Sequence, residues 1–187
     1  MVNLKKSLIG LSIALMCGVS YAGPFTLTSS DIADGKTMSK QQEFQGFGCT
    51  GDNQSPALSW SGAPGDTKAY AILVHDPDAP TGGSGWWHWQ MINIPQEVTH
   101  LESGAGNSDN QRAPEGSQQI RNDYGIQGFG GACPPKGDKP HRYRFTIYAL
   151  SQPLDLPSHP SAALTGYMVN SYALASDTIE ALYQVQN

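Results

Sequence analysis

The chain has 187 residues, a formal net charge of −5, 21 glycines and 13 prolines. Its acidic balance argues against nucleic acid or an anionic membrane surface as a partner, because both attract basic proteins. The length is that of one domain, and so many glycines and prolines favour short strands joined by elaborate loops.

Residues 1–22 have the pattern of a signal peptide. Two lysines precede an apolar run, residues 8–19, which is too short to span a bilayer, and residues 20–22 fit a small-residue cleavage site. We therefore expect one mature domain, residues 23–187, with a net charge of −7 once those two lysines are lost. It should be soluble, periplasmic or secreted, with no integral membrane segment.

The cysteines fit an oxidising compartment. Cleavage removes Cys17 and leaves Cys49 and Cys133, which most simply form a disulfide. On the chain-entropy model, closing so long a loop stabilises the fold by about 4 to 5 kcal/mol. Two buried free thiols are the alternative. Lipid anchoring through Cys17 is less favoured, because Met16 stands where a small residue is expected.

Two short strands are predicted early in the mature chain, at residues 25–28 and 57–60. Each is a brief apolar alternation bounded by turn residues. A long polar loop, residues 46–56, leads into the second strand and contains the first of the two retained cysteines.

The chain is organised around residues 69–95. Residues 69–74 form a continuous apolar run, typical of a strand covered on both faces, and its even-numbered side chains share one face with Asp76. Two prolines then fix a stiff corner that carries Asp76 and Asp78, and His88 opens the next alternating run. We expect these acids and this imidazole at one rim of a sheet. The alternative is that Asp-Pro-Asp is ordinary turn chemistry.

Two loop segments follow. Residues 103–122 are polar and without clear periodicity, which predicts a surface excursion. Residues 122–135 are rich in glycine and end in paired prolines, so their exposed amide groups could form an anion-binding nest.

Residues 140–150 form the clearest alternating strand. His141, Tyr143, Phe145 and Ile147 share one face, so an imidazole and a phenol extend the buried stripe to the start of the strand. The arginines between them point the other way and are expected to be solvated or paired with acidic neighbours.

The last part of the chain predicts one helix and one strand. Ser161 has the pattern of a helix N-cap, and Leu164, Tyr167 and Met168 follow at helical spacing. Alternating apolar residues between 178 and 185 predict a closing strand.

Several ordered motifs together resemble a known family. CTGDNQSPALSW, DPDAP followed by WWHW, and GGACPPKGDKPHRY resemble the phosphatidylethanolamine-binding protein family, specifically its bacterial YbhB/YbcL Raf-kinase-inhibitor-like branch. The exported form with two cysteines most resembles the periplasmic YbcL type. The resemblance covers nearly the whole mature chain, which we call the PEBP-like domain after the abbreviation of phosphatidylethanolamine-binding protein. It implies a mainly β fold, an antiparallel β-sandwich with one C-terminal helix and a small anion-binding pocket.

The resemblance also implies which residues form the pocket. Carried over to this sequence, the ligand-binding positions are Asp76, Asp78, His88, Gly131, Pro134, His141 and Tyr143. The eukaryotic members carry additional pocket aromatics that this chain lacks, so lipid or kinase specificity is not carried over. Trp86 is a further candidate for the pocket wall. Trp87 and Trp89 are assigned to the core, and the remaining histidines to the surface or core.

The chemistry of these side chains suits a phosphate-like group. Two imidazoles, a phenol and loop amides can donate hydrogen bonds to an anion in a nearly dry site. Ionised Asp76 and Asp78 cannot donate. They either hold the imidazoles oriented and protonated, or receive the ammonium of a zwitterionic head group.

Three functions are compatible with this constellation. The favoured one is a non-enzymatic binding protein for a small anionic or phosphorylated ligand, with no metal or other cofactor. The alternative is a metal-dependent or other hydrolase that uses the His/Asp cluster, although local metal-ligand spacing is absent and Ser84 lacks a nucleophile elbow. The third is inhibition or modulation of a protein partner, which the sequence does not identify.

Overall fold

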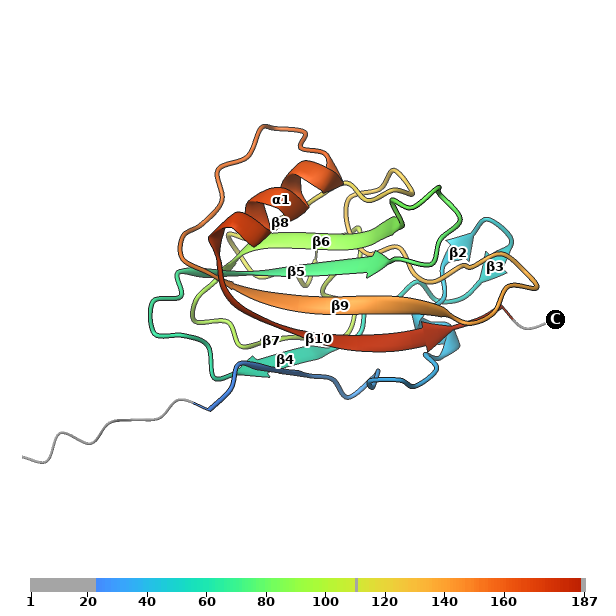
Figure 1. The fold of residues 1–187 in the computed structure, drawn as a ribbon, viewed down its shortest axis with the longest axis horizontal. Coiled ribbons are helices and arrows are strands. Elements are labelled where there is room, and N and C mark those ends of the chain that lie inside the picture. The colour runs from blue at the N-terminus through green and yellow to red at the C-terminus, as the bar shows by residue number, and fades with distance from the viewer. Residues whose placement is uncertain (1–22, 110, 186–187) are drawn as a thin grey trace, which may run out of the picture.

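The computed structural model describes residues 23–109 and 111–185 (Figure 1). The predicted signal peptide, residues 1–22, lies outside this range and stays a prediction. Within the described residues, no helix is both long and apolar enough to cross a membrane.

The fold is mainly β and antiparallel, as predicted. The central sheet has the order β10-β9-β5-β6-β8, and a smaller sheet has the order β1-β4-β7 (Figure 1). The strands of the central sheet are β5 (Ala69–Asp76), β6 (Trp86–Pro95), β8 (Gln118–Gln119), β9 (His141–Leu150) and β10 (Ala173–Tyr183). Those of the smaller sheet are β1 (Thr26–Thr28), β4 (Leu58–Ser61) and β7 (His100–Leu101). A 3₁₀ turn at Lys40–Gln42 precedes a hairpin of β2 (Gln45–Gly46) and β3 (Cys49–Thr50).

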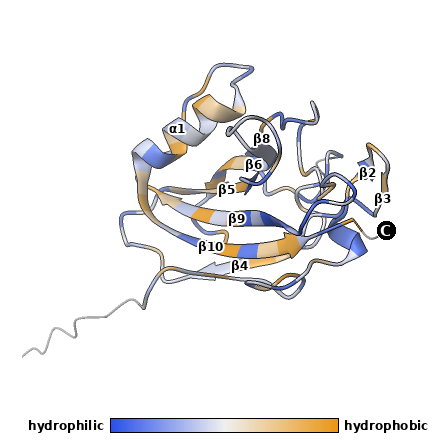
Figure 2. Cartoon of the chain, turned by 45° about the vertical axis from the view of Figure 1, so that its right-hand side comes forward, coloured by the Kyte–Doolittle hydropathy of each residue, from blue (hydrophilic) through white to orange (hydrophobic). Residues whose placement is uncertain are grey.

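The core lies on both faces of the central sheet. On β5, Tyr70, Ile72 and Val74 pack in the larger core with Trp60 of β4. The intervening residues of β5 pack instead in a smaller core beneath the helix α1, Ala162–Tyr172. Hydrophobic and hydrophilic residues follow one another along β9 and β10 (Figure 2). Because β5 contributes residues to both cores, the prediction that residues 69–74 form a strand covered on both faces is confirmed.

Helix α1 begins as predicted but buries a different face. The Ser161 hydroxyl accepts a hydrogen bond from the backbone N–H of Leu164 (3.1 Å), which is the expected N-cap. Thr165 and Val169 are fully buried, whereas Tyr167 is 70% exposed. Gly166 faces the Trp87 ring, where an added Cβ would lie 3.4 Å away. A small residue thus allows close approach of the helix to the sheet, while Leu164 and Tyr167 face outward and Met168 packs against the smaller core.

The prediction of a surface excursion at residues 103–122 is wrong in part. Ala105 and Ile120 are buried, and β8 pairs with β6 within this segment. Gly106 lies directly against the Trp89 ring, where a Cβ would be only 2.5 Å away. The segment is polar in composition, but its few small and apolar residues pack inward.

Strand pairing brings three strand ends to one rim of the central sheet. Because β5 runs antiparallel to both β6 and β9, the end of β5 meets the beginnings of the other two. Asp76 at the end of β5 lies opposite Trp86 at the start of β6, and His75 lies opposite Arg144 of β9.

A disulfide closes the same region of the molecule. Cys49 of β3 is bonded to Cys133, as predicted, across a sequence separation of 84 residues. The bond ties the β2–β3 hairpin to the glycine-rich loop that precedes β9.

Candidate functional site

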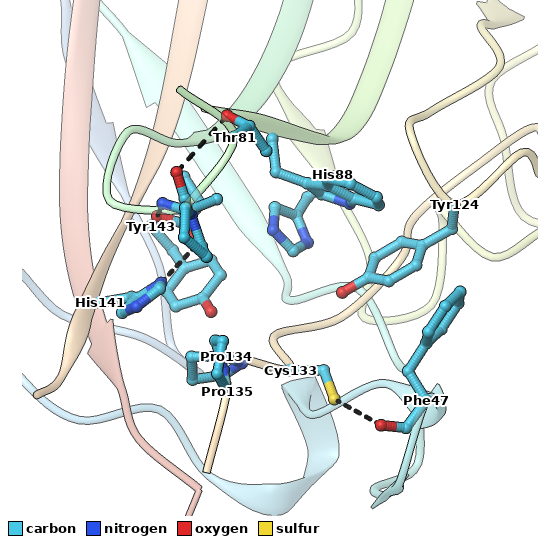
Figure 3. Close-up of a pocket in the computed structure, with 13 residues that line it drawn as sticks. Phe47, Thr81, His88, Tyr124, Cys133, Pro134, Pro135, His141 and Tyr143 are labelled. Carbon is cyan, nitrogen blue, oxygen red and sulfur yellow. Dashed lines mark hydrogen bonds and ion pairs between the residues drawn. The ribbon is translucent and has the colours of Figure 1, made fainter. Parts of the chain in front are cut away.

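A pocket of about 300 Å³ opens at the rim where β5, β6 and β9 meet (Figure 3). Strand ends supply its polar side chains, while the β2–β3 hairpin and the loops supply its walls. Its lining residues are Phe47, Asp76, Ala79, Pro80, Thr81, Trp86, His88, Tyr124, Cys133, Pro134, Pro135, His141 and Tyr143.

Most of the predicted site residues converge on this pocket. Asp76, His88, Pro134, His141 and Tyr143 line it, although they come from three strands and a loop. The structure does not bring the other two, Asp78 and Gly131, to the pocket surface. Trp86 lines the pocket and Trp89 lies in the core, as expected from the sequence.

Asp76 is a buried structural anchor. One of its oxygens, Oδ1, accepts hydrogen bonds from the backbone N–H groups of Asp78 (2.8 Å) and Ala79 (3.1 Å). The other, Oδ2, lies 2.8 Å from Nδ1 of His141. Asp76 therefore holds the corner after β5 in shape and orients the His141 imidazole, which is the orienting part of the first role predicted for it.

His141 stands between two carboxylates. Its Nδ1 faces Asp76, and its Nε2 lies 3.4 Å from Oδ2 of Asp138. The His141 side chain is only 3% exposed, whereas that of Asp138 is 44% exposed. The contact with Asp138 is thus the longer and more exposed of the two.

His88 is held from behind by backbone carbonyl groups. Its Nδ1 lies 2.7 Å from the Gly130 oxygen and 3.1 Å from the Gly131 oxygen. Carbonyl oxygens only accept hydrogen bonds, so Nδ1 carries the proton. Burial lowers the pKa of His88 to about 4, although the Gly130 carbonyl and the Asp76 carboxylate oppose this shift. The neutral ring therefore presents an acceptor at Nε2, and the prediction of His88 as a donor is corrected.

Tyr143 brings a hydroxyl group without a partner of ordinary geometry among the described residues. The side chain is buried, and its ring centroid lies 5.0 Å from that of His88 (Figure 3). Burial and the nearby Asp76 carboxylate, with which the hydroxyl also interacts, raise the pKa of Tyr143, so the hydroxyl keeps its proton and can donate.

The aromatic wall contains two residues that the sequence did not identify. Tyr124 stacks on Phe44 with ring centroids 3.9 Å apart and forms an edge contact with Trp86 at 5.2 Å. Its hydroxyl donates to the Gly131 oxygen (3.1 Å). Phe47, which is 79% exposed, closes the outer side of the wall. The only available signal was an aromatic residue between two glycines for Phe47, and one directly before a glycine for Tyr124.

Trp86 supplies a second unpartnered donor. Its indole Nε1 is buried and has no hydrogen-bond partner among the residues that the structure describes. A buried donor left unpaired costs about 1 to 3 kcal/mol, which makes two of them in one pocket wall unusual.

Asp78 has a structural partner instead of a place in the pocket. Its carboxylate accepts hydrogen bonds from Nε (2.8 Å), Nη2 (2.7 Å) and the backbone N–H (2.9 Å) of Arg142. The Arg142 guanidinium holds the pKa of Asp78 well below its usual range. Arg142 follows His141 on the opposite face of β9, so Asp78 is drawn away from the pocket.

The glycine-rich loop offers carbonyl groups to the site instead of the expected amides. The backbone N–H of Gly130 donates to the His88 oxygen (2.8 Å), and that of Gly131 donates to Oδ1 of Asn53 (2.7 Å). An added Cβ at Gly131 would lie 2.4 Å from the Gln42 oxygen, so only glycine fits there. The proposed amide nest is therefore not available at these two residues.

The pocket has little positive charge. None of its lining residues is lysine or arginine, and its acid, Asp76, is paired with His141. Across residues 23–109 and 111–185, no group of three or more His, Cys, Asp or Glu side chains could hold a metal ion.

The chain is similar to known proteins along nearly its whole length. The family model described as phosphatidylethanolamine-binding protein matches residues 28–184. The YbcL protein of Escherichia coli K12 is 46% identical over 184 residues, a match that covers 98% of this chain and all of YbcL. The YbhB protein of the same strain is 42% identical over 158 residues, which covers 84% of this chain and 98% of YbhB. The crystal structure of Escherichia coli YbcL, described as a new member of the mammalian PEBP family, matches with a TM-score of 0.85 and 48% identity over 88% of this chain and all of that one.

Proposed function

Because the chain belongs to the phosphatidylethanolamine-binding protein family, we propose that it is a binding protein whose pocket holds a small anionic or phosphorylated group. The observation that carries this proposal is a pair of buried donors in the wall of one pocket, the Tyr143 hydroxyl and the Trp86 indole N–H. Neither has a hydrogen-bond partner of ordinary geometry among the described residues. A ligand oxygen that accepts from both would remove the cost of leaving them unpaired.

The aromatic wall supports a head group with a cationic end. Trp86, Tyr124 and Phe47 stand near one another at the pocket, and aromatic faces attract ammonium groups by about 0.5 to 2 kcal/mol. A zwitterion such as phosphoethanolamine would place its phosphate on the buried donors and its ammonium against these rings or near Asp76. This is the second role predicted for Asp76.

Export and partner binding belong to the same proposal. The signal pattern of residues 1–22 and the Cys49–Cys133 disulfide support a periplasmic or secreted protein. The exposed ring of Phe47 at the pocket mouth would let a protein partner that presents an anionic group reach the same site. Such a partner would be inhibited or modulated by capture of that group.

Isothermal titration calorimetry tests the proposal. Inorganic phosphate, phosphoethanolamine and ethanolamine are titrated into the mature chain at about pH 6, where a phosphate monoester still carries part of its second proton. We expect saturable binding of both phosphate compounds and none of ethanolamine alone. Absence of binding for both phosphate compounds, with a folded protein by circular dichroism, would contradict the proposal.

A further inference from the structure

The hydrogen-bonding sense of His88 is fixed by the backbone. Nδ1 must donate, because both of its partners are carbonyl oxygens, at 2.7 and 3.1 Å. No hydrogen bond to a described residue occupies Nε2, and the ring lines the pocket between Tyr124 and Tyr143 (Figure 3). In the neutral ring this nitrogen carries a lone pair and no proton, so it accepts and cannot donate.

The surroundings of His88 favour the neutral ring. The residue is 2% exposed, and burial lowers its pKa to about 4. Its titratable neighbours are Asp76 and His75 of β5, His141 and Tyr143 of β9, and Tyr124 of the glycine-rich loop. Of these, Asp76 favours the protonated ring and His75 opposes it, while both phenols remain uncharged.

The pocket thus combines two donors that lack partners of ordinary geometry among the described residues with an acceptor nitrogen, Nε2 of His88. The Tyr143 hydroxyl and the Trp86 N–H can each donate to an oxygen, whereas Nε2 of His88 requires a donor from the ligand. No lysine or arginine lines the pocket to compensate for a second negative charge beside Asp76.

We infer that Nε2 of His88 accepts a hydrogen bond from the ligand, so that the pocket selects an oxyanion carrying its own proton, such as phosphate, over a fully ionised one, such as sulfate. The inference rests on the proposed function and adds the protonation state of the ligand. Inorganic phosphate keeps at least one proton near neutral pH and can donate it to Nε2. Sulfate has none, so its oxygens would face the lone pair of His88 unless the ring itself took up a proton.

The expected ratio of phosphate affinity to sulfate affinity follows from the cost of protonating His88. With a pKa of about 4, the protonated ring is rare at neutral pH, so sulfate binding should be weaker on the order of 100-fold or more. That penalty shrinks as the pH falls. Sulfate affinity should rise about tenfold per pH unit between roughly pH 7 and pH 5, because its binding takes up one proton.

The test compares phosphate and sulfate by isothermal titration calorimetry at constant ionic strength, at about pH 7.5, 6 and 4.5. We expect phosphate to bind at every pH and sulfate to approach it only at the acid end. Equal affinities at about pH 7.5 would overturn the inference and leave the proposed anion pocket intact. Failure of both ions to bind at any of these pH values would overturn the proposed function as well.

A substitution at His88 tests whether the preference for phosphate over sulfate comes from Nε2 of this ring or from the overall charge of the pocket. His88→Gln places an amide near the position of Nε2, and this amide can donate as well as accept. We expect the preference for phosphate over sulfate at about pH 7.5 to fall at least tenfold in this variant. His100→Gln, whose side chain is 62% exposed on β7, is the matched control and should keep the wild-type preference. Loss of the preference in the control, or its retention in His88→Gln, would contradict the inference. If His88→Gln does not fold, the wild-type pH series decides alone.

Discussion

Each polar residue of the pocket has a role set by its partners. Asp76 accepts hydrogen bonds from two backbone N–H groups and lies against His141, so it shapes the site. His88 is held at Nδ1 and offers only Nε2. The Tyr143 hydroxyl, like the Trp86 indole N–H, lacks a partner of ordinary geometry within the described chain, and Tyr143→Phe removes it with little change of shape.

Tyr143→Phe should weaken phosphate binding about 10- to 100-fold, because it removes one hydrogen bond to a charged group, worth about 1.5 to 3 kcal/mol. Thermal stability should be unchanged or slightly higher, since an unpaired buried hydroxyl is also lost. Calorimetric titration and a thermal melt check the two effects separately. Tyr148→Phe, on β9 but in the core beneath α1, is the control and should bind phosphate normally. An unchanged phosphate affinity in Tyr143→Phe would count against the site.

Asp78→Asn should reduce stability and leave phosphate binding nearly unchanged. The Arg142 guanidinium lowers the pKa of Asp78, so the carboxylate stabilises the fold fully above the unfolded pKa of about 3.9 and progressively less as the pH falls below it. The variant should therefore be less stable than wild type at neutral pH, with the difference shrinking below about pH 4. Urea unfolding across pH measures this, with the exposed Asp66→Asn as control. A large loss of phosphate affinity in Asp78→Asn would instead restore Asp78 to the pocket.

At this scale the sequence predicted positions better than roles. The shared parity of Asp76 with its strand, and of His141 with Tyr143, correctly placed these side chains at one rim. Parity could not show that Nδ1 of His88 would donate to carbonyl groups 42 and 43 residues away. This contact leaves Nε2 as an acceptor toward the pocket, where the sequence had predicted a donor. Tyr124 escaped prediction because a glycine-rich loop has no periodicity from which to infer direction.

At the level of elements, strands form the floor of the pocket and loops form its walls. Antiparallel pairing of β5 with β6 and β9 brings the polar residues together. The walls depend on the β2–β3 hairpin and the glycine-rich loop, which the disulfide joins. The strands and the N-cap of α1 were predictable from local patterns. The order of the strands and the buried face of α1 were not, because they depend on which distant surfaces fit together.

Replacing both cysteines, Cys49→Ser with Cys133→Ser, should lower the free energy of unfolding by about 4 to 5 kcal/mol on the chain-entropy model. It should also weaken phosphate binding, because Cys133 and Phe47 both line the pocket and the bond fixes their loops together. Urea unfolding and calorimetry under conditions where the variant stays folded measure the two effects. Wild-type affinity in the folded variant would show that the hairpin does not need the bond to form the wall.

The whole molecule is an antiparallel β domain with a pocket at the rim of its central sheet, and we propose that it is exported. The family and the fold class are shared with the Escherichia coli YbcL protein, and the match extends over 98% of the chain. Composition and charge had already disfavoured nucleic acid as a partner. Neither composition nor fold specifies the natural ligand, because that depends on a few polar atoms whose positions are set by tertiary contacts.

Export predicts a defined N-terminus. When the full chain is produced in a bacterium with a periplasm, the protein recovered from the periplasmic fraction should begin at Gly23, as measured by intact mass and N-terminal sequencing. Replacing Ala22 with a bulky residue should block this cleavage, because the site needs a small residue. Accumulation of uncleaved chain in the cytoplasm would contradict the assignment of residues 1–22.

Nuclear magnetic resonance of protein labelled with ¹⁵N in its histidines tests the central claim most directly, because each ring nitrogen reports its own proton and partners. On titration with inorganic phosphate, we predict saturable shifts at Nε2 of His88 and in the ring of His141, with Nδ1 of His88 remaining protonated throughout. The exposed rings of His100 and His159 serve as internal controls and should shift little. Saturable shifts confined to those exposed rings, or no shifts at His88 and His141, would contradict a pocket that binds an anion at the rim of this sheet.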